Sequence, residues 1–126
     1  VDRSKNIIRR SGENIAAAEV EDKLYKNGLI SKLACIAVAD DMREEEVMAC
    51  IVLNRGIKIS EKTALSIFTE ASKELAYFKL PGWILFLDDL PVTGTQKVVK
   101  HRIFETGVDP RSLPNVFDLR NKKKRA

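Results

Sequence analysis

Apolar residues gather in three short runs along the chain, and these runs predict the strands of a small α+β domain. Residues 33–39, 47–53 and 83–87 consist largely of apolar side chains, which is typical of buried strands. Because each run is almost continuously apolar, we expect both faces of a central three-stranded sheet to be covered. The polar residues 40–46 form the connection between the first two strands.

Two other segments carry apolar residues at helical spacing and are expected to flank this sheet. Residues 16–27 place apolar side chains on one face, and acidic residues in the early turns suit the helix dipole. Ser60 is a good N-cap for a second helix, whose broad apolar stripe reaches Leu75. A short final helix is predicted over residues 98–105.

The first fifteen residues predict a two-stranded hairpin in front of the sheet. Residues 5–10 alternate loosely between polar and apolar, Ser11-Gly12 is a turn signal, and Ile15 restarts an extended segment. Gly12 is free to adopt a positive φ at this turn or to let another backbone approach closely.

Residues 108–126 are predicted to form an irregular basic tail, because Pro110 and Pro114 interrupt them. The formal net charge of the chain is +4. Four positive residues near the end account for all of it: Lys122, Lys123, Lys124 and Arg125. Residues 1–107 are therefore neutral overall, which argues against a basic platform for nucleic acid.

Composition narrows the function classes further. The 126 residues suffice for one modest domain, and no apolar run approaches the ~20 residues of a membrane span. We expect a cytoplasmic protein with no membrane span and no specific nucleic-acid partner. Cys35 and Cys50 lack metal-ligand spacing and His101 lacks a partner, so we predict no metal site and two buried cysteines.

Three ordered motifs lie along residues 2–104. They read D-R-S-K at residues 2–5, I-x-x-x-G-x-x-I-x-x-x-E-V-E at 8–21 and L-P-V-T-G-T-Q-K at 90–97. Together they resemble the C-terminal domain of the adenylate-forming acyl-CoA synthetases, a superfamily that also holds peptide-synthetase adenylation domains and firefly-type luciferases. The family usually has glycine at the position of Gln96.

The resemblance implies a two-step reaction. A carboxylic acid attacks the α-phosphate of ATP to give acyl-AMP and pyrophosphate, and the thiol of coenzyme A then displaces AMP. Residues 1–107 would be the mobile lid, with a hinge at 2–6 that rotates it against its own N-terminal domain. We expect the chain to be a fragment that is inactive alone, because that domain would hold the acid and most of the ATP, coenzyme A and Mg²⁺ contacts.

The resemblance also assigns roles by position. Lys97 aligns with the adenylation lysine, whose charge would stabilise the negative charge that develops at the α-phosphate. Lys5 aligns with the hinge residue, and Arg3 with an arginine near the nucleotide. The loop that resembles the one facing the active site in the thioester step contains Arg9, Gly12 and Asn14.

Within that loop, Gly12 matches the glycine whose missing side chain opens the tunnel for pantetheine. Arg9 and Arg10 are candidate contacts for the acyl-adenylate or for the phosphates of coenzyme A. As a bare pair, such arginines are more often a solvated basic patch.

Two other functions stay open. The chain could be the lid of an adenylation domain that serves a carrier protein, or a non-catalytic basic module that binds RNA or a protein. Lysine at position 5 favours coenzyme A over a carrier protein, because the peptide-synthetase branch favours aspartate at the hinge. The neutral charge of residues 1–107 counts against the binding module.

Overall fold

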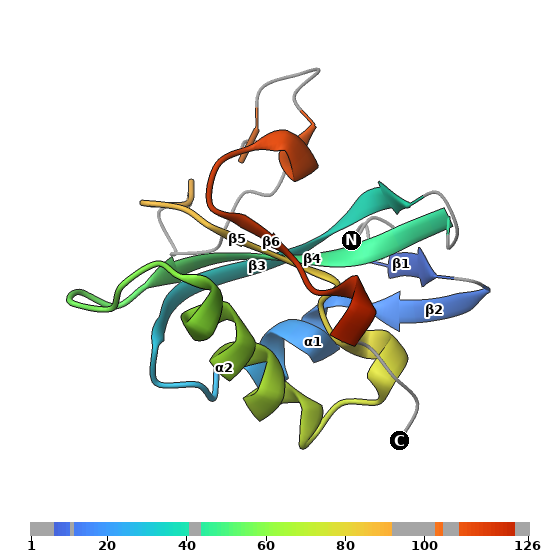
Figure 1. The fold of residues 1–126 in the computed structure, drawn as a ribbon. Coiled ribbons are helices and arrows are strands. Elements are labelled where there is room, and N and C mark those ends of the chain that lie inside the picture. The colour runs from blue at the N-terminus through green and yellow to red at the C-terminus, as the bar shows by residue number, and fades with distance from the viewer. Residues whose placement is uncertain (1–6, 11, 41–43, 92–102, 105–108, 123–126) are drawn as a thin grey trace.

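A computed structural model describes residues 7–10, 12–40, 44–91, 103–104 and 109–122. One mixed sheet runs through the domain, with both helices packed on the same face (Figure 1). In chain order the elements are β1 (Ile7–Arg10), β2 (Glu13–Ala16), α1 (Ala17–Leu24), β3 (Ile30–Asp40), β4 (Glu44–Leu53), α2 (Glu61–Ser72), a 3₁₀ turn (Tyr77–Lys79), β5 (Trp83–Phe86), a 3₁₀ turn (Pro110–Ser112), β6 (Val116–Asp118) and a 3₁₀ turn (Arg120–Lys122).

Strand β4 is the centre of the sheet. β3 runs antiparallel to β4 from the pair Ile30↔Leu53 to the pair Asp40↔Glu44. β5 is parallel to β4 and β6 is antiparallel to β5, while β1 meets β4 at the pair Arg10↔Glu44. The α+β class and the three predicted core strands are confirmed. The predicted strand count is wrong, because the N-terminal hairpin and β6 join the same six-stranded sheet.

Alternation along the strands explains why the core strands are apolar throughout, since successive side chains point to opposite faces. In β4, Val47, Ala49 and Ile51 face the helices. Met48 and Cys50 face the other side, where later segments of the chain cover them. These covering residues include Leu90, Ile103, Phe104, Leu113 and Val116. The prediction that both faces are covered is confirmed.

The two helices begin near the predicted positions. Ser60 caps α2, because its side-chain oxygen accepts a hydrogen bond of 3.2 Å from the amide of Thr63. α2 ends at Ser72, so Leu75 lies beyond it, although its side chain is buried. α1 ends at Leu24 rather than at the predicted residue 27.

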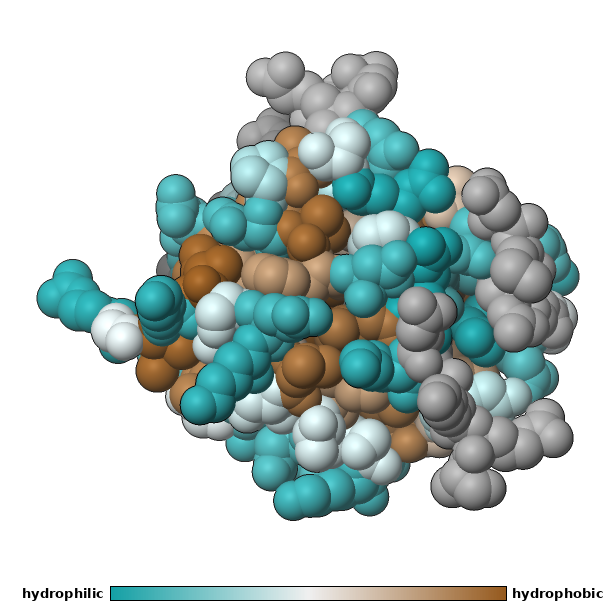
Figure 2. Space-filling model, viewed as in Figure 1, coloured by the Kyte–Doolittle hydropathy of each residue, from teal (hydrophilic) through white to brown (hydrophobic). Residues whose placement is uncertain are grey.

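Helix α1 also protects the free edge of β3, which pairs with β4 alone among the described strands. The amide of Leu33 donates to Tyr25 Oη over 2.9 Å, and the amide of Cys35 donates to Glu21 Oε2 over 2.8 Å. Occupied amides make such an edge a poor template for pairing with another chain. Polar side chains dominate the surface in Figure 2, with small apolar areas between them.

The predicted irregular tail contains a strand, β6, which is a correction. Val116 pairs with Leu85 and Phe117 with Ile84, and the Phe117 ring lies 5.8 Å from that of Phe86. The strand completes the open edge of β5. Three residues are too few for a period-two pattern to be read from sequence. The helix predicted over 98–105 falls mostly outside the described residues.

Glu44 offers a test of backbone strain at the start of β4. Its φ is 67°, a left-handed conformation that costs a non-glycine residue about 1–2 kcal/mol. We expect Glu44→Gly to raise the free energy of unfolding by no more than about 1 kcal/mol, because the strain is relieved but glycine's greater flexibility in the unfolded state offsets part of the gain. Urea denaturation measures the change.

Two variants serve as controls for this prediction. Glu44→Ala removes the carboxylate but keeps the Cβ atom, so it should give no gain. Asn115 also has a positive φ, of 65°, but asparagine tolerates it, so Asn115→Gly should gain less. Equal gains from Glu44→Ala and Glu44→Gly would show that charge rather than backbone strain is relieved.

Candidate functional site

Three predicted site residues lie in the hairpin formed by β1 and β2. Arg9 in β1 stands directly opposite Asn14 in β2, and both side chains are exposed. Gly12 lies in the turn between them. The hairpin predicted from the sequence is confirmed, and it brings Arg9, Gly12 and Asn14 to one end of the domain. Lys97, Lys5 and Arg3 lie outside the described residues.

Gly12 has the conformation that its turn signal predicts. Its φ is +82°, and a Cβ atom added to it would meet no atom of the described domain within 4 Å. The described residues therefore leave open space around this turn and set no steric limit on residue 12 beyond its backbone conformation.

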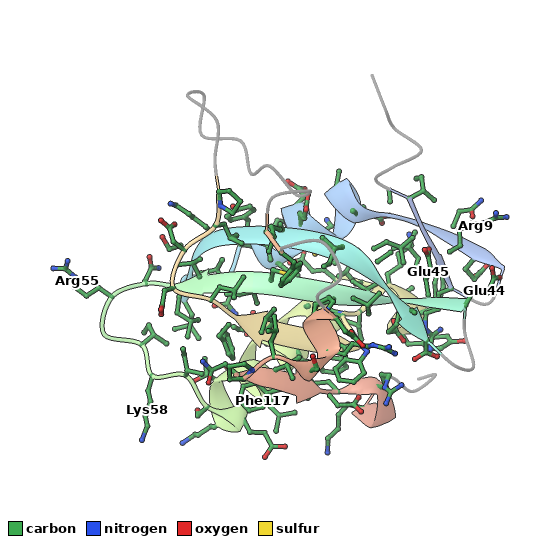
Figure 3. All side chains as sticks on the ribbon, turned by 90° about the horizontal axis from the view of Figure 1, so that it is seen from above. Arg9, Glu44, Glu45, Arg55, Lys58 and Phe117 are labelled. Carbon is green, nitrogen blue, oxygen red and sulfur yellow. The ribbon has the colours of Figure 1, made fainter. Side chains whose placement is uncertain are left out.

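The structure separates Arg9 from Arg10. Arg9 lies near Glu44 and Glu45 at the hairpin end of the domain (Figure 3), and its backbone amide donates to Glu45 Oε1 over 2.8 Å. Arg10 points inward, is only 6% exposed, and places Nε 3.0 Å from Glu46 Oε1. The hypothesis that both arginines bind phosphate is therefore wrong for Arg10, whose guanidinium is buried in an ion pair.

Alternation explains this separation. Ile8 is buried, and Arg10 lies two residues further along β1, hence on the same side of the strand. The partner Glu46 is 1% exposed and lies in β4 next to the buried Val47, whose amide donates to Glu46 Oε2 over 2.8 Å. Sequence reasoning missed Glu46, because it placed residues 40–46 in a polar connection, whereas β4 begins at Glu44.

Gly82 makes the space that Glu46 occupies. A Cβ atom at residue 82 would lie 2.5 Å from Glu46 Cγ, 2.6 Å from Cδ and 2.9 Å from Oε1. The Gly82 amide donates to the carbonyl of Val47 over 2.9 Å, which fixes its backbone beside β4. A side chain at residue 82 is therefore incompatible with this position of the Glu46 carboxylate.

A second arginine reaches the same end of β3 and β4 from the C-terminal segment. Arg120 Nη1 lies 2.9 Å from Asp40 Oδ1, and Arg120 Nη2 lies 2.8 Å from Asp118 Oδ2. The guanidinium also covers the Trp83 ring at 4.5 Å. Hydrogen bonds to Asp118 and Asp40 raise the pKa of Arg120 further above its usual range. Sequence reasoning missed Arg120 because it expected an irregular tail.

The segment that carries Lys97 (residues 90–97), called the lysine loop below, begins at the end of the sheet opposite the hairpin turn. β5 is parallel to β4, and its last pair is Ile51↔Phe86. Leu90 is buried beyond this point and Pro91 is half-buried, after which residues 92–97 lie outside the described part. From Glu44 to Ile51 the strand spans about 23 Å at ~3.3 Å per residue. The hairpin turn and the start of the lysine loop therefore lie far apart.

Metal binding finds no support in the part of the chain that the structure describes. No group of three His, Cys, Asp or Glu side chains there could hold a metal ion. Cys35 and Cys50 are both buried, as predicted. Among the same residues, no helix is long and apolar enough to cross a membrane.

Known proteins share this domain. Residues 19–97 match the family model described as AMP-binding enzyme C-terminal domain. The chain is 39% identical over 103 residues to a mitochondrial medium-chain acyl-CoA ligase, ACSF2, of Danio rerio, covering 82% of this chain and 16% of that protein. It is 36% identical over 103 residues to the crotonobetaine/carnitine–CoA ligase of Proteus mirabilis, covering 82% and 19%.

A solved structure agrees with this similarity. The crystal structure of an acyl-CoA synthetase from Brucella canis matches with a TM-score of 0.73 and 28% sequence identity. The match covers 80% of this chain and 19% of that one. The chain thus corresponds to less than a fifth of each of these three proteins.

The ion pair between Arg120 and Asp118 predicts that the stability of the domain depends on pH. The Arg120 guanidinium holds the pKa of Asp118 below its usual range. A carboxyl group whose pKa is lower in the folded state than in the unfolded state stabilises the domain at pH values above its unfolded pKa. This stabilisation is lost as the pH falls through the pKa of the folded state. Because the Asp118 side chain is 42% exposed, we expect this ion pair to contribute less than about 1 kcal/mol to the free energy of unfolding.

We therefore expect Asp118→Asn to lower the free energy of unfolding at pH 7. The gap between the unaltered domain and this variant should shrink as the pH falls below about 4. Urea denaturation of both proteins at pH 7, 5 and 3 measures the gap. Asp88→Asn, at an exposed aspartate after β5, is the matched control and should leave stability nearly unchanged. A gap for Asp118→Asn that is constant with pH would contradict the prediction.

Proposed function

Because the chain belongs to the family of AMP-binding enzyme C-terminal domains, we propose that it is the mobile C-terminal domain of an ATP-dependent acid–CoA ligase. In the first step a carboxylate oxygen bonds to the α-phosphorus of ATP and pyrophosphate leaves. In the second step the sulfur of coenzyme A bonds to the acyl carbon and AMP leaves. The chain would complete the active site in turn for each step.

The hairpin turn is the observation that carries this proposal. Gly12 has a left-handed backbone, open space above it, and the exposed Arg9 beside it. A turn of this kind can border a narrow tunnel for a thiol arm, while an exposed guanidinium suits a phosphate. Asn14, opposite Arg9 in the hairpin, completes the surface that we assign to the thioester step.

We assign the first step to Lys97. Its ammonium group would approach the α-phosphate and stabilise the charge that gathers on the non-bridging oxygens. Lys5 would be the hinge that absorbs the rotation of the domain, and Arg3 would contact the nucleotide. Gln96, in place of the usual glycine, would keep the backbone less free next to Lys97.

The partner in this proposal is a large N-terminal domain. It would hold the acid, most of the ATP and coenzyme A contacts, and the Mg²⁺ ion that neutralises the phosphates. The chain alone would therefore be inactive, and the acid would be chosen outside it. We place the whole enzyme in the cytoplasm, as the sequence predicts.

The proposal can be tested with a fused ligase, in which residues 1–126 replace the C-terminal domain of the Proteus mirabilis relative. Lys97→Ala in this fusion should slow adenylation by about 10²–10³, because one electrostatic partner of the transition state is lost. ATP–pyrophosphate exchange measures this step. Thioester formation from supplied acyl-adenylate should stay within a few-fold.

Lys100→Ala, three residues further along, is the matched control and should leave both steps unchanged. A fusion that lacks adenylation activity before any substitution would contradict the proposed function. Equal losses for Lys97→Ala and Lys100→Ala would contradict the role of Lys97.

Gly12→Leu tests the second step. A leucine side chain at this turn should block the thiol arm, so thioester formation from supplied adenylate should fall at least about 100-fold while adenylation persists. Gly56 is the matched control, because it also has a positive φ, of 90°, and open space around it. Gly56 adjoins Arg55, which lies at the opposite end of the domain from Arg9 (Figure 3).

Gly56→Leu should therefore carry the same backbone strain without slowing the thioester step. If Gly12→Leu slowed adenylation as much as thioester formation, the hairpin would not be specific to the second step. Transfer to a carrier protein but not to coenzyme A, in the unaltered fusion, would favour the carrier-protein function instead.

A further inference from the structure

The Arg10–Glu46 ion pair lies beside the hairpin turn and does not face it. Arg10 is 6% exposed and Glu46 is 1% exposed, with Arg10 Nε 3.0 Å from Glu46 Oε1. Charges this deeply buried are strongly unfavourable unless each is paired and hydrogen-bonded. The pair therefore fixes the distance between β1 and β4 rather than offering a charge to a ligand.

The backbone connection between these two strands is short. Within the described residues, the ladder between β1 and β4 consists of the single pair Arg10↔Glu44. Two side-chain contacts reinforce it, from the Arg9 amide to Glu45 and from Arg10 to Glu46. Arg10 is two residues from Gly12, so this anchor is the one nearest the turn on the β1 side.

Gly82 is independent evidence that the Glu46 carboxylate occupies a fixed position in the packing. An added Cβ atom would lie between 2.5 and 2.9 Å from three atoms of the Glu46 side chain. Real side chains do not approach so closely, so any residue other than glycine would displace Glu46. Three strands thus meet at this carboxylate: β1 through Arg10, β4 through Glu46 itself, and the entry to β5 through Gly82.

We propose that Arg10, Glu46 and Gly82 are positioning residues for the thioester step, an inference that rests on the function proposed above. The ion pair holds the hairpin turn at a fixed angle to the sheet, which aims Gly12 and Arg9 at the partner domain. Without the ion pair, the hairpin turn changes its angle to the sheet, because among the described residues a single backbone pair joins β1 to β4. The lysine loop starts at the opposite end of β4 and β5, so adenylation does not depend on the pair.

A double-mutant cycle in the fused ligase tests this proposal. Arg10→Ala and Glu46→Ala should each slow thioester formation from supplied acyl-adenylate at least about tenfold. The double variant should be no slower than the slower single variant, because both remove the same anchor. Adenylation, measured on the same preparations, should change less than about twofold and reports the folded fraction.

Two more variants keep the test decisive where a truncation prevents folding. Gly82→Ala retains both charges but displaces Glu46, so it should also slow the thioester step and spare adenylation. Arg10→Lys keeps the positive charge and should recover part of the rate lost in Arg10→Ala. A purely structural role would lower both half-reactions together in all five variants.

Three results would overturn the inference: parallel losses in both half-reactions, additive losses across the cycle, or an unchanged thioester step in Gly82→Ala and Arg10→Ala. These results differ from failure of the proposed function. That failure would appear as a missing half-reaction in the fusion before any substitution.

Discussion

The buried carboxylate of Glu46 is the constraint on which the arrangement of this sheet depends. A charge that is 1% exposed is unfavourable by several kcal/mol unless its partners are close and well placed. Arg10, the amide of Val47 and the absence of a side chain at Gly82 meet that requirement together. The first hairpin, the central strand and the entry to β5 are thereby fixed relative to one another.

The same end of the β3–β4 hairpin also anchors the C-terminal segment. Asp40 accepts from Arg120, whose neighbour Leu119 is buried and donates its amide to the carbonyl of Gly82 over 2.7 Å. Asp40 and Glu46 thus pair with arginines from opposite ends of the chain. Apolar layers on both faces of the sheet add to this cross-linking. Such a body moves as one unit, which is what a hinged domain requires.

The sequence predicted the core strands, the Ser60 cap and the turn at Gly12, because each depends on local pattern or local backbone chemistry. It could not predict the packing of Arg10 against Glu46, since the two residues are 36 positions apart in sequence and periodicity says nothing about partners. β6 escaped prediction for the same reason. Its three residues become a strand through the open edge of β5 rather than through their own pattern.

Geometry gives a reason for the domain rotation in the proposed function. The hairpin turn and the start of the lysine loop are separated by the length of β4, about 23 Å at ~3.3 Å per residue. In that proposal both would have to reach the same reacting carboxyl group, one in each step. The buried ion pair and the two apolar layers hold both ends of the sheet in one body. A rotation of the whole body about the proposed hinge at residues 2–6 would exchange the two ends and leave these contacts intact.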